Sequence, residues 1–473
     1  MDVNMLGSNS FANVKSVYYD GSASDGYADI VLDAGAAVLY DVPNSQLLYY
    51  VGDEYVKSVR DIDNPTVNAT TFYFNKTDSI SPIAANGTFT YSIAGTGETF
   101  PYGSATLSAA QKTQLVLTLD TSANITMTGT VNGTSGTSAL NGVGTYFTRL
   151  NTGDKIEFAG NTRTYYISAI TNDTSLTVVG GLPANLTGNT YFKAFKAGDM
   201  IDLAGKGSTA GATRTVTATS TSLTVDLKET FPSTLNATLS YRLARTTAKE
   251  VEKLKRASRY VKINCSTNTK GTSGPYDLGF SDVYQIKSIR LGTGGSYPAS
   301  NTAGTDVTTL FKFDNGQRDN LYDHGTITPT GIGLSATDRL LVELDYFEPN
   351  FTSRAGYFSI DSYPIEDDDT MYSSAVDIRT ENVSIYKSPI NGKEYNLRNY
   401  LDFRPVKTNS ATDATTPGTA TENPTKSFAY QNSTNGLRIP ASSSQITYDY
   451  TTYMGRKDLL VVDKDKRFQV ITG

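Results

Sequence analysis

The feature that most constrains the fold of this chain is a short stretch that occurs twice. NTGDKIEFAG at 151–160 is echoed by KAGDMIDLAG at 196–205, which places the second Gly-Asp pair 45 residues after the first. The similarity continues downstream, where TSLTV at 174–178 returns at 221–225, although the second copy carries an additional segment, GKGSTAGA, inside its hairpin. Repetition at this spacing indicates one supersecondary unit that is used twice.

The composition favours strands and turns. Among the 473 residues are 31 Tyr and 40 Gly, Trp is absent, and Thr, Ser and Asn are abundant. Tyr, Thr and Val fit the pleated, half-buried surface of a sheet, whereas Gly, Asn and Asp favour turns. The length predicts several domains, because single cores stop growing well below this size. We therefore expect an all-β protein with several small barrel or sandwich domains in tandem.

Charge and cysteine content exclude several classes of protein. The net charge of −6 argues against binding to a nucleic-acid backbone, which needs a clustered excess of Lys and Arg. The single cysteine, Cys265, permits neither an intramolecular disulfide framework nor a cysteine zinc site. The first residues lack a secretory signal pattern, and no apolar run is long enough to span a bilayer. We therefore expect a chain made in a reducing cytoplasm, without a nucleic-acid partner or a membrane span.

Turn signals divide the chain into four expected segments. Residues 1–125 alternate short strands with turns such as Asn86-Gly87, and Ser108 to Gln111 fit one helical turn. Residues 126–195 and 196–248 are the two repeat copies, each with four or five short strands, which suits a small barrel. In each copy the Gly-Asp pair predicts a tight turn whose Asp side chain bonds nearby amides. Residues 249–473 form the last expected segment.

One short helix is expected to link the repeat copies to that last segment. TAKEVEKLKRASRY at 247–260 has a narrow apolar stripe that includes Val251 and Leu254, and it pairs Glu252 with Arg256 at i,i+4. Its basic residues are interpreted as a solvated face rather than a phosphate patch. Further on, the Thr- and Pro-rich tract at 407–427 predicts an exposed or partly disordered loop. The C-terminal stretch predicts two strands with residues 463–466 at the hairpin tip.

Residues that could carry nucleophilic chemistry are few. His324 is the only histidine, so a catalytic triad or a Cys-His pair would have to include it. It lies in NLYDHGTI, which is typical of a surface turn. Cys265 lies in INCST, which alternates like an ordinary strand. Both residues are therefore interpreted as structural.

An acidic run offers the only pattern that suggests a metal. Glu366, Asp367, Asp368 and Asp369 are consecutive, and clustered carboxylates can hold Ca²⁺. A calcium loop spaces its ligands at alternate positions, so adjacent acids favour a solvated loop, and metal binding there is left open. No catalytic, cofactor-binding or metal-binding residue is assigned, and we expect the chain not to be an enzyme.

The C-terminal half carries a resemblance to a known family. FKFDNGQRDNLYDHG (311–325), LLVELDYFEPN to AGYFSIDSYP (340–364), NLRNYLDFRPVK (396–407) and YDYTTYMGRKDLLVVDKDKRFQVITG (448–473) follow one another in this order. Together they resemble a domain of uncharacterised function in large virion structural proteins of T-even-like contractile-tailed phages, especially those infecting cyanobacteria. The resemblance covers roughly 260–473, and the upstream modules resemble small tail-associated β-barrels.

The chain departs from that family in two ways. Met454-Gly455-Arg456 stands where the family usually has Leu-Pro-Arg. Relatives also continue past the final hairpin, so the alternative that this chain is one part of a longer polypeptide stays open. The family pattern carries no catalytic residue to this sequence.

The resemblance implies a structural component of a virion, located in the baseplate or fibre-attachment region of the tail. Such a protein would assemble with other virion proteins or with copies of itself, in a symmetric arrangement. An alternative is a receptor- or carbohydrate-binding surface module with Tyr165 and Tyr166 as stacking platforms. A third is a tail-associated polysaccharide depolymerase.

The matched phrases can also be explained as conformational braces. We expect Arg318 to pair with Asp314, Asp319 or Asp323 around the Asn315-Gly316 turn. Within LRNYLDFRP, we expect Arg404 to anchor a strand end and Asp402 to receive a bidentate contact from an arginine such as Arg398. Bracing of this kind suits a rigid scaffold.

Overall fold

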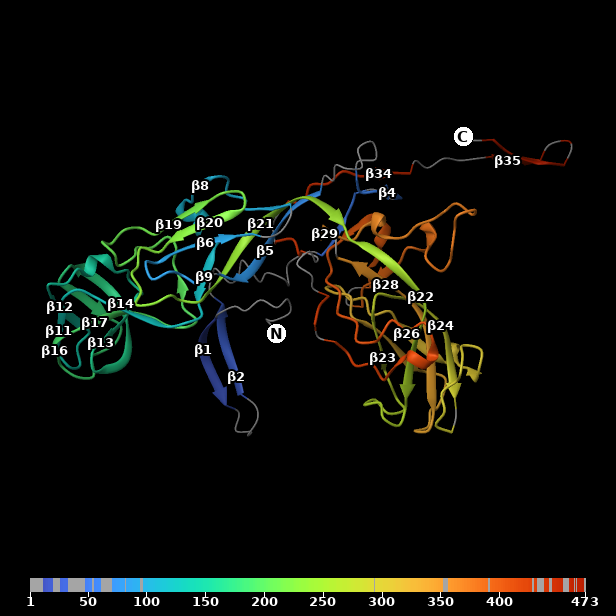
Figure 1. Ribbon diagram of the computed structural model, residues 1–473, viewed down its shortest axis with the longest axis horizontal. Coiled ribbons are helices and arrows are strands. Elements are labelled where there is room, and N and C mark those ends of the chain that lie inside the picture. The colour runs from blue at the N-terminus through green and yellow to red at the C-terminus, as the bar shows by residue number, and fades with distance from the viewer. Residues whose placement is uncertain are drawn as a thin grey trace. The chain divides into compact units, whose positions relative to one another are not determined.

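Strands dominate the computed structural model of the protein (Figure 1). It describes residues 12–19, 26–32, 47–52, 55–60, 70–80, 82–93, 97–292, 294–351, 356–389, 392–427, 429–431, 438–441, 445–453, 459–462, 464 and 466–471. The expectation of an all-β protein with several sheets is confirmed. The chain divides into two units, which are described separately: Met1–Ser45, Tyr73–Arg245 and Ala441–Ser444 in the first, and Gln46–Phe72, Thr246–Pro440 and Gln445–Gly473 in the second.

The first repeat copy folds into a barrel-like body of eight strands in the first unit (Figure 1). The order is β10-β17-β13-β14-β15-β12-β11-β16, and all pairs are antiparallel. Only Thr190 separates β16 from β17, although they lie near opposite ends of this order, so the sheet must curl. The bounds are β10 Ala123–Thr126, β11 Thr130–Gly133, β12 Ala139–Val143, β13 Lys155–Phe158, β14 Asn161–Asn172, β15 Ser175–Val178, β16 Leu186–Asn189 and β17 Tyr191–Phe195, with the 3-10 turn η2 at Phe147–Arg149.

The second repeat copy completes its sheets with strands that precede the first copy. One sheet has the order β6-β20-β19-β8, and another runs β18-β9-β21, with β5 and β7 also pairing β21. The first copy is therefore inserted between β9 and β18. The bounds are β5 Thr70–Ser79, β6 Thr88–Ser92, β7 Glu98–Thr99, β8 Ala105–Thr106, β9 Val116–Leu119, β18 Met200–Ile201, β19 Thr215–Ala218, β20 Ser222–Asp226 and β21 Ala237–Glu250.

Two further features belong to the first unit. The helical turn predicted at Ser108 to Gln111 is confirmed as α2, Ala109–Lys112, with Ser108 as its N-cap in a reciprocal capping box with Gln111. The strands β1 Ala12–Tyr19 and β2 Gly26–Leu32 form a separate antiparallel pair.

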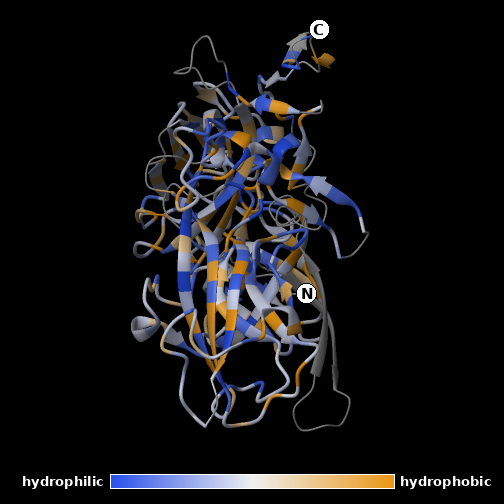
Figure 2. Cartoon of the chain, turned by 90° about the vertical axis from the view of Figure 1, so that its right-hand side faces the viewer, coloured by the Kyte–Doolittle hydropathy of each residue, from blue (hydrophilic) through white to orange (hydrophobic). Residues whose placement is uncertain are grey.

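The second unit is built on long antiparallel strands. A five-stranded sheet has the order β25-β24-β28-β22-β33, and a three-stranded sheet has the order β23-β27-β26. Apolar and polar residues both occur along the strands (Figure 2), and the central strand β28 is buried along most of its length. The bounds are β22 Glu252–Asn264, β23 Tyr276–Ser281, β24 Val283–Gly292, β25 Thr305–Asp306, β26 Phe311–Asp314, β27 His324–Pro329, β28 Arg339–Asn350 and β33 Thr421–Glu422.

Shorter elements surround these sheets. Strand β3 pairs with β32, β4 with β34, β30 with β31, and the end of β21 with β29. Residues 46–72 therefore belong to the second unit. As a result, the four segments expected from the sequence do not coincide with the two units. The bounds are β3 Leu48–Tyr50, β4 Val56–Ser58, β29 Gly356–Tyr357, β30 Ile385–Lys387, β31 Glu394–Asn396, β32 Tyr400–Asp402 and β34 Thr451–Thr452. The 3-10 turns are η3 Thr308–Leu310, η4 Ile360–Ser362, η5 Thr380–Asn382, η6 Leu397–Asn399 and η7 Pro417–Thr419.

The prediction of a linking helix at 247–260 is wrong. These residues form the end of β21 and most of β22, which pairs with β28 from Glu252 to Asn264. Thr247 and Ser258 have φ values of 53° and 56°, which an α-helix does not accommodate. The narrow apolar stripe matched a helix by chance, and pairing to a distant strand overrode the local helical preference.

Two predictions near the C-terminus have mixed outcomes. The tract at 407–427 is ordered rather than disordered, because β33 pairs with β22, and Ala414 and Ala420 pack in a cluster with Tyr260. The final hairpin is confirmed as β35 Leu459–Val462 paired with β36 Phe468–Ile471. Met454-Gly455-Arg456, Asp463 and Asp465 lie outside the described residues.

Candidate functional site

The repeated Gly-Asp pairs form two equivalent turns, as predicted. Gly153 and Gly198 have φ values of 90° and 92°, a conformation that favours glycine. In each turn the Asp side chain accepts a hydrogen bond from the backbone N–H three residues earlier, Asn151 to Asp154 and Lys196 to Asp199, both at 2.8 Å. The repeated phrase therefore encodes the same side-chain-braced turn in two places.

Both turns lie at the junction between the repeat copies. The Nζ atom of Lys193, on β17, is 2.9 Å from Asp154 Oδ2. The Asp199 carboxylate of the second copy binds Lys155 of the first. Asn151 is hydrogen-bonded reciprocally to the backbone of Lys206 across the same junction. The turn aspartates thus serve two purposes, because they close their own turns and join the copies.

A buried carboxylate lies at the centre of this junction. Glu229 Oε1 is 2.8 Å from Lys193 Nζ and 3.0 Å from Arg214 Nη2, and the three side chains are almost fully buried. The other oxygen of Glu229 accepts hydrogen bonds from the backbone N–H and hydroxyl of Ser208. A buried charge with this many partners fixes the geometry of its surroundings. We name Lys193, Arg214, Ser208 and Glu229 the junction network.

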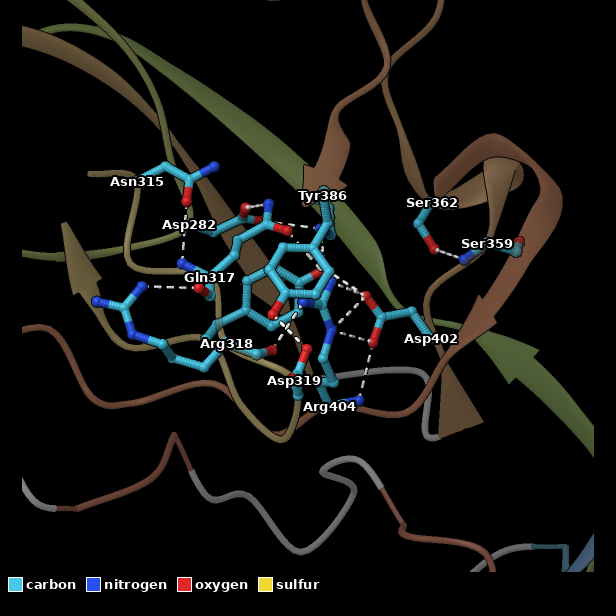
Figure 3. A network of polar contacts seen from close by, with 12 residues as sticks. Asp282, Asn315, Gln317, Arg318, Asp319, Ser359, Ser362, Tyr386, Asp402 and Arg404 are labelled. Carbon is cyan, nitrogen blue, oxygen red and sulfur yellow. Dashed lines mark hydrogen bonds and ion pairs between the residues drawn. The ribbon is translucent and has the colours of Figure 1, made fainter. Parts of the chain in front are cut away.

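The second unit holds another buried ionic network, centred on Arg404 (Figure 3). Arg404 is fully buried, and its Nη2 and Nε atoms are 2.7 and 3.0 Å from the two oxygens of Asp402. Its Nη1 donates to the backbone carbonyl of Arg318 at 3.0 Å, and its Nη2 also donates to the Tyr322 hydroxyl at 3.1 Å. This arginine therefore connects strand β32 to the DNGQRDN segment.

A second buried cation completes this network. Lys253 Nζ donates to Asp282 Oδ2 at 2.7 Å and lies 4.5 Å from the centre of the Phe358 ring and 4.6 Å from that of Tyr322. Burial alone lowers the pKa of Lys253, but Asp282 and the surrounding groups outweigh it and raise that pKa well above its usual value. The lysine stays charged, held by a carboxylate and by cation–π contacts. We name Lys253, Asp282, Tyr322, Asp402 and Arg404 the core network.

The acidic members of the core network are equally well held. Burial alone raises the pKa of Asp402, but Arg404, Lys253 and the Tyr322 hydroxyl outweigh it and keep the pKa below its usual value. Burial also raises the pKa of the Tyr322 hydroxyl well above its usual value, so this group stays a hydrogen-bond donor. The arrangement is a set of matched charges and donors inside the protein.

The predicted braces in the matched phrases are confirmed in part. Arg318 binds Asp314 through two hydrogen bonds of 3.0 and 2.9 Å. Asp402 receives the expected bidentate arginine contact, but from Arg404, so only the naming of Arg398 is wrong. Asp402 Oδ1 also accepts a hydrogen bond from the Arg404 backbone N–H at 2.9 Å, so the contact joins residues only two apart, and a local Asp-to-backbone pattern would have identified it.

The two candidate nucleophilic residues, His324 and Cys265, are both buried within the fold. His324 is buried at the start of β27, so its prediction as a surface turn is wrong. Its Nδ1 is 3.0 Å from Asp277 Oδ1 and its Nε2 is 2.8 Å from the Thr408 carbonyl oxygen, so both ring nitrogens face oxygen acceptors. Cys265 is buried beside the end of β22, and burial raises the pKa of its thiol.

Neither the acidic run at 366–369 nor the pair of Tyr165 and Tyr166 has the surroundings that a ligand site needs. Asp367 bonds Thr380 and Asp369 pairs with Arg379 within an exposed loop. Across the described residues, no three acidic, histidine or cysteine side chains gather as a metal would require. Of the two tyrosines, Tyr166 is 48% exposed, whereas Tyr165 is 1% exposed and packs on Phe158. Tyr165 therefore belongs to the core and offers no platform.

Comparison with known proteins does not assign a function to this chain. No family model matches the chain, and neither the curated proteins nor the solved structures include a significant match. Where the chain is described, it has no helix with the length and apolar character needed to cross a membrane.

Proposed function

We propose that this protein is a structural component of a tailed-phage virion, in the baseplate or fibre-attachment region of the tail. The observation that carries the proposal is the convergence of the phrases that resemble the virion family. DNGQRDN supplies the Arg318 carbonyl, LYDHG supplies Tyr322, and LDFRP supplies Asp402 and Arg404. These segments meet in the core network, so the resemblance coincides with a brace rather than with exposed reactive groups.

The chemistry of both networks fits a load-bearing scaffold. Buried charges that are fully paired tolerate little displacement, because separating them leaves a desolvated charge without a partner. A scaffold protein needs this resistance where neighbouring subunits exert force on it. Under the proposal, its partners are other virion proteins or further copies of the chain, and it is made in the host cytoplasm before assembly.

Immunogold electron microscopy of purified particles tests the proposal. Antibodies raised against the full chain should label the tail end or the fibre bases, and peptides of the chain should be found by mass spectrometry of the same particles. An antibody against a capsid protein provides the matched control for labelling. Particles that carry capsid label but neither label nor peptides of this chain would rule the proposal out.

A further inference from the structure

A pocket at the junction of the repeat copies has the composition of a ligand site. Its volume is about 150 Å³. An engineered protein cavity of about 150 Å³ binds benzene, so a pocket of this size holds a ligand of one ring. The lining side chains are mostly hydroxylated or aromatic, with a single arginine: Ile125, Thr126, Met127, Thr128, Tyr146, Arg149, Tyr191, Ser208, Thr209 and Thr230.

The additional segment of the second copy builds one wall of this pocket. Ser208 and Thr209 belong to GKGSTAGA, the stretch that the first copy lacks. Ser208 is fixed by Glu229 of the junction network, and the Thr209 hydroxyl is 3.3 Å from that of Thr230. Gly211 has a φ of 66°, and a Cβ there would approach Arg149 Cγ to 3.2 Å, so the segment packs closely on the arginine stem. The wall is therefore held in place.

Two polar groups at the pocket, in the part of the chain that the structure describes, make no hydrogen bond or ion pair with other side chains. The Tyr191 side chain is 1% exposed, and its hydroxyl, near the backbone of Tyr146, makes no hydrogen bond of normal geometry. Arg149 stacks on the Tyr146 ring with its guanidinium carbon 4.0 Å from the ring centre. Among the described residues, that guanidinium forms no hydrogen bond or ion pair, and the groups that its charge acts on are the Asp173 carboxylate and the Tyr191 hydroxyl. Buried hydroxyls without a partner are rare, so an occupant that bonds to them is favoured.

We infer that this pocket binds a single sugar ring that carries a carboxylate, such as a uronic acid unit of an acidic polysaccharide. The planar guanidinium of Arg149 matches a carboxylate through two parallel hydrogen bonds. The threonine hydroxyls and Tyr191 match the ring hydroxyls, and Tyr146, which is 43% exposed, offers an aromatic face to the ring. Inorganic phosphate would accept hydrogen bonds from the arginine and from the hydroxyl groups, but it has no ring to lie against the face of Tyr146.

This inference goes beyond the scaffold function and does not depend on it. It also relocates the carbohydrate-binding alternative from Tyr165 and Tyr166 to a pocket that the repeat creates. Any protein with this junction has the site, whether or not it is part of a virion. Failure of the virion experiment therefore leaves the binding experiment fully informative, and the reverse also holds.

Titration of the purified full chain with glucuronate, glucose and inorganic phosphate tests the assignment, followed by saturation-transfer NMR. We expect glucuronate to bind in the millimolar range and glucose to bind about tenfold more weakly, since a hydrogen-bonded charge pair contributes at least that factor. Arg149→Gln should weaken glucuronate binding about tenfold, and Tyr191→Phe about threefold. Arg163→Gln is the matched control, because Arg163 also stacks on a tyrosine of the barrel but does not line the pocket.

Several outcomes would overturn the inference. Equal binding of glucose and glucuronate would remove the role of the carboxylate. Phosphate that displaces glucuronate with equal affinity would reduce the site to an adventitious anion site. Glucuronate binding that survives both Arg149→Gln and Tyr191→Phe would place the ligand elsewhere, and no binding by the wild type would remove the site. Tyr191→Phe keeps the ring, so it reports on the site even if Arg149→Gln unfolds.

Discussion

Lys193 of the first repeat copy and Glu229 of the second form an ion pair of 2.8 Å in which both side chains are buried. Lys193 lies in the first copy of the repeated unit and Glu229 in the second. The ion pair therefore forms only when the two copies pack against each other. The same lysine also holds Asp154, the turn residue of the repeated phrase. The contact between the two copies thus includes an aspartate of the repeated phrase.

We expect Glu229→Gln to destabilise the first unit by about 3 kcal/mol, because the change leaves Lys193 and Arg214 buried without a matching charge. Hydrogen exchange of peptides from 73–245, measured in the full chain, gives the free energy of opening. Lys196→Gln is the control, since Lys196 is 36% exposed in its pair with Glu157 and such pairs contribute about 1 kcal/mol or less. Equal effects of the two substitutions would contradict a special role for the junction network.

The core network of the second unit predicts a similar contrast. Asp402→Asn should destabilise this unit by about 3–5 kcal/mol, because Arg404 and Lys253 then lack their shared carboxylate. Asp314→Asn removes another carboxylate from a bidentate arginine pair, but Asp314 and Arg318 are 44% and 34% exposed, so its effect should stay near or below about 1 kcal/mol. Hydrogen exchange of peptides from 246–440 measures both. A larger effect of Asp314→Asn would refute this ranking.

The lowered pKa of Asp402 predicts that the stability of the second unit depends on pH in the acidic range. Its pKa in the folded state lies below its usual value, because Arg404, Lys253 and Tyr322 outweigh the opposing effect of burial. A lowered folded pKa contributes stability that is present above the unfolded pKa of about 3.9 and is lost as the pH falls through the folded pKa. The opening free energy of the second unit should therefore fall below pH about 4 in the wild type, and less steeply in Asp402→Asn. Parallel pH profiles of the two proteins would contradict this.

Two turn glycines test how closely the chain is packed at the junction. Gly87, in the predicted Asn86-Gly87 turn, has a φ of 78°, and a Cβ there would lie 2.5 Å from the Glu229 carbonyl oxygen. Gly153 has a φ of 90° but open space around the same position. Gly153→Ala should cost about 1 kcal/mol of backbone strain, and Gly87→Ala clearly more. Urea denaturation of both variants measures the difference, and equal losses would show that the clash is relieved.

The sequence was sufficient to predict the local features but not their partners. Alternating Tyr, Thr and Val with frequent Gly and Asp predicted the all-β class, and Gly153-Asp154 predicted its own turn, because these signals act over a few residues. The pairing of Leu119 with Ala237 joins strands on either side of the whole first copy. Nothing near either residue encodes that partner, so the insertion of one copy between strands of the other was missed.

The core network and the pocket were also hard to predict from the sequence, because most of their parts come from segments that are distant in the chain. Lys253 looked like part of a solvated helix face, because the groups that hold it, Asp282 and the aromatic rings, come from distant segments. Arg404 and Asp402 are only two residues apart, and the Arg404 backbone N–H donates to the Asp402 carboxylate, so this pair could have been predicted as a local contact. The pocket could not be predicted, because its walls come from both copies and from an additional segment that resembles an ordinary loop.

Tyr191 predicts a loss of stability at alkaline pH. Burial raises its pKa to about 12, although the Tyr146 backbone and Arg149 partly offset this effect. A folded pKa raised above the unfolded value of about 10 contributes stability that is complete below pH 10 and is lost as the pH rises through 12. The Tyr191→Phe variant has no ionisable hydroxyl at this position. Between pH 10 and 12, its free energy of unfolding should therefore fall by about 2 kcal/mol less than that of the wild type. Tyr102→Phe is a second test, because burial also raises the pKa of Tyr102 to about 12. Denaturation profiles measured at intervals of pH give the comparison, and a Tyr191→Phe profile that follows the wild type would show that the pKa of this hydroxyl is not raised in the folded state.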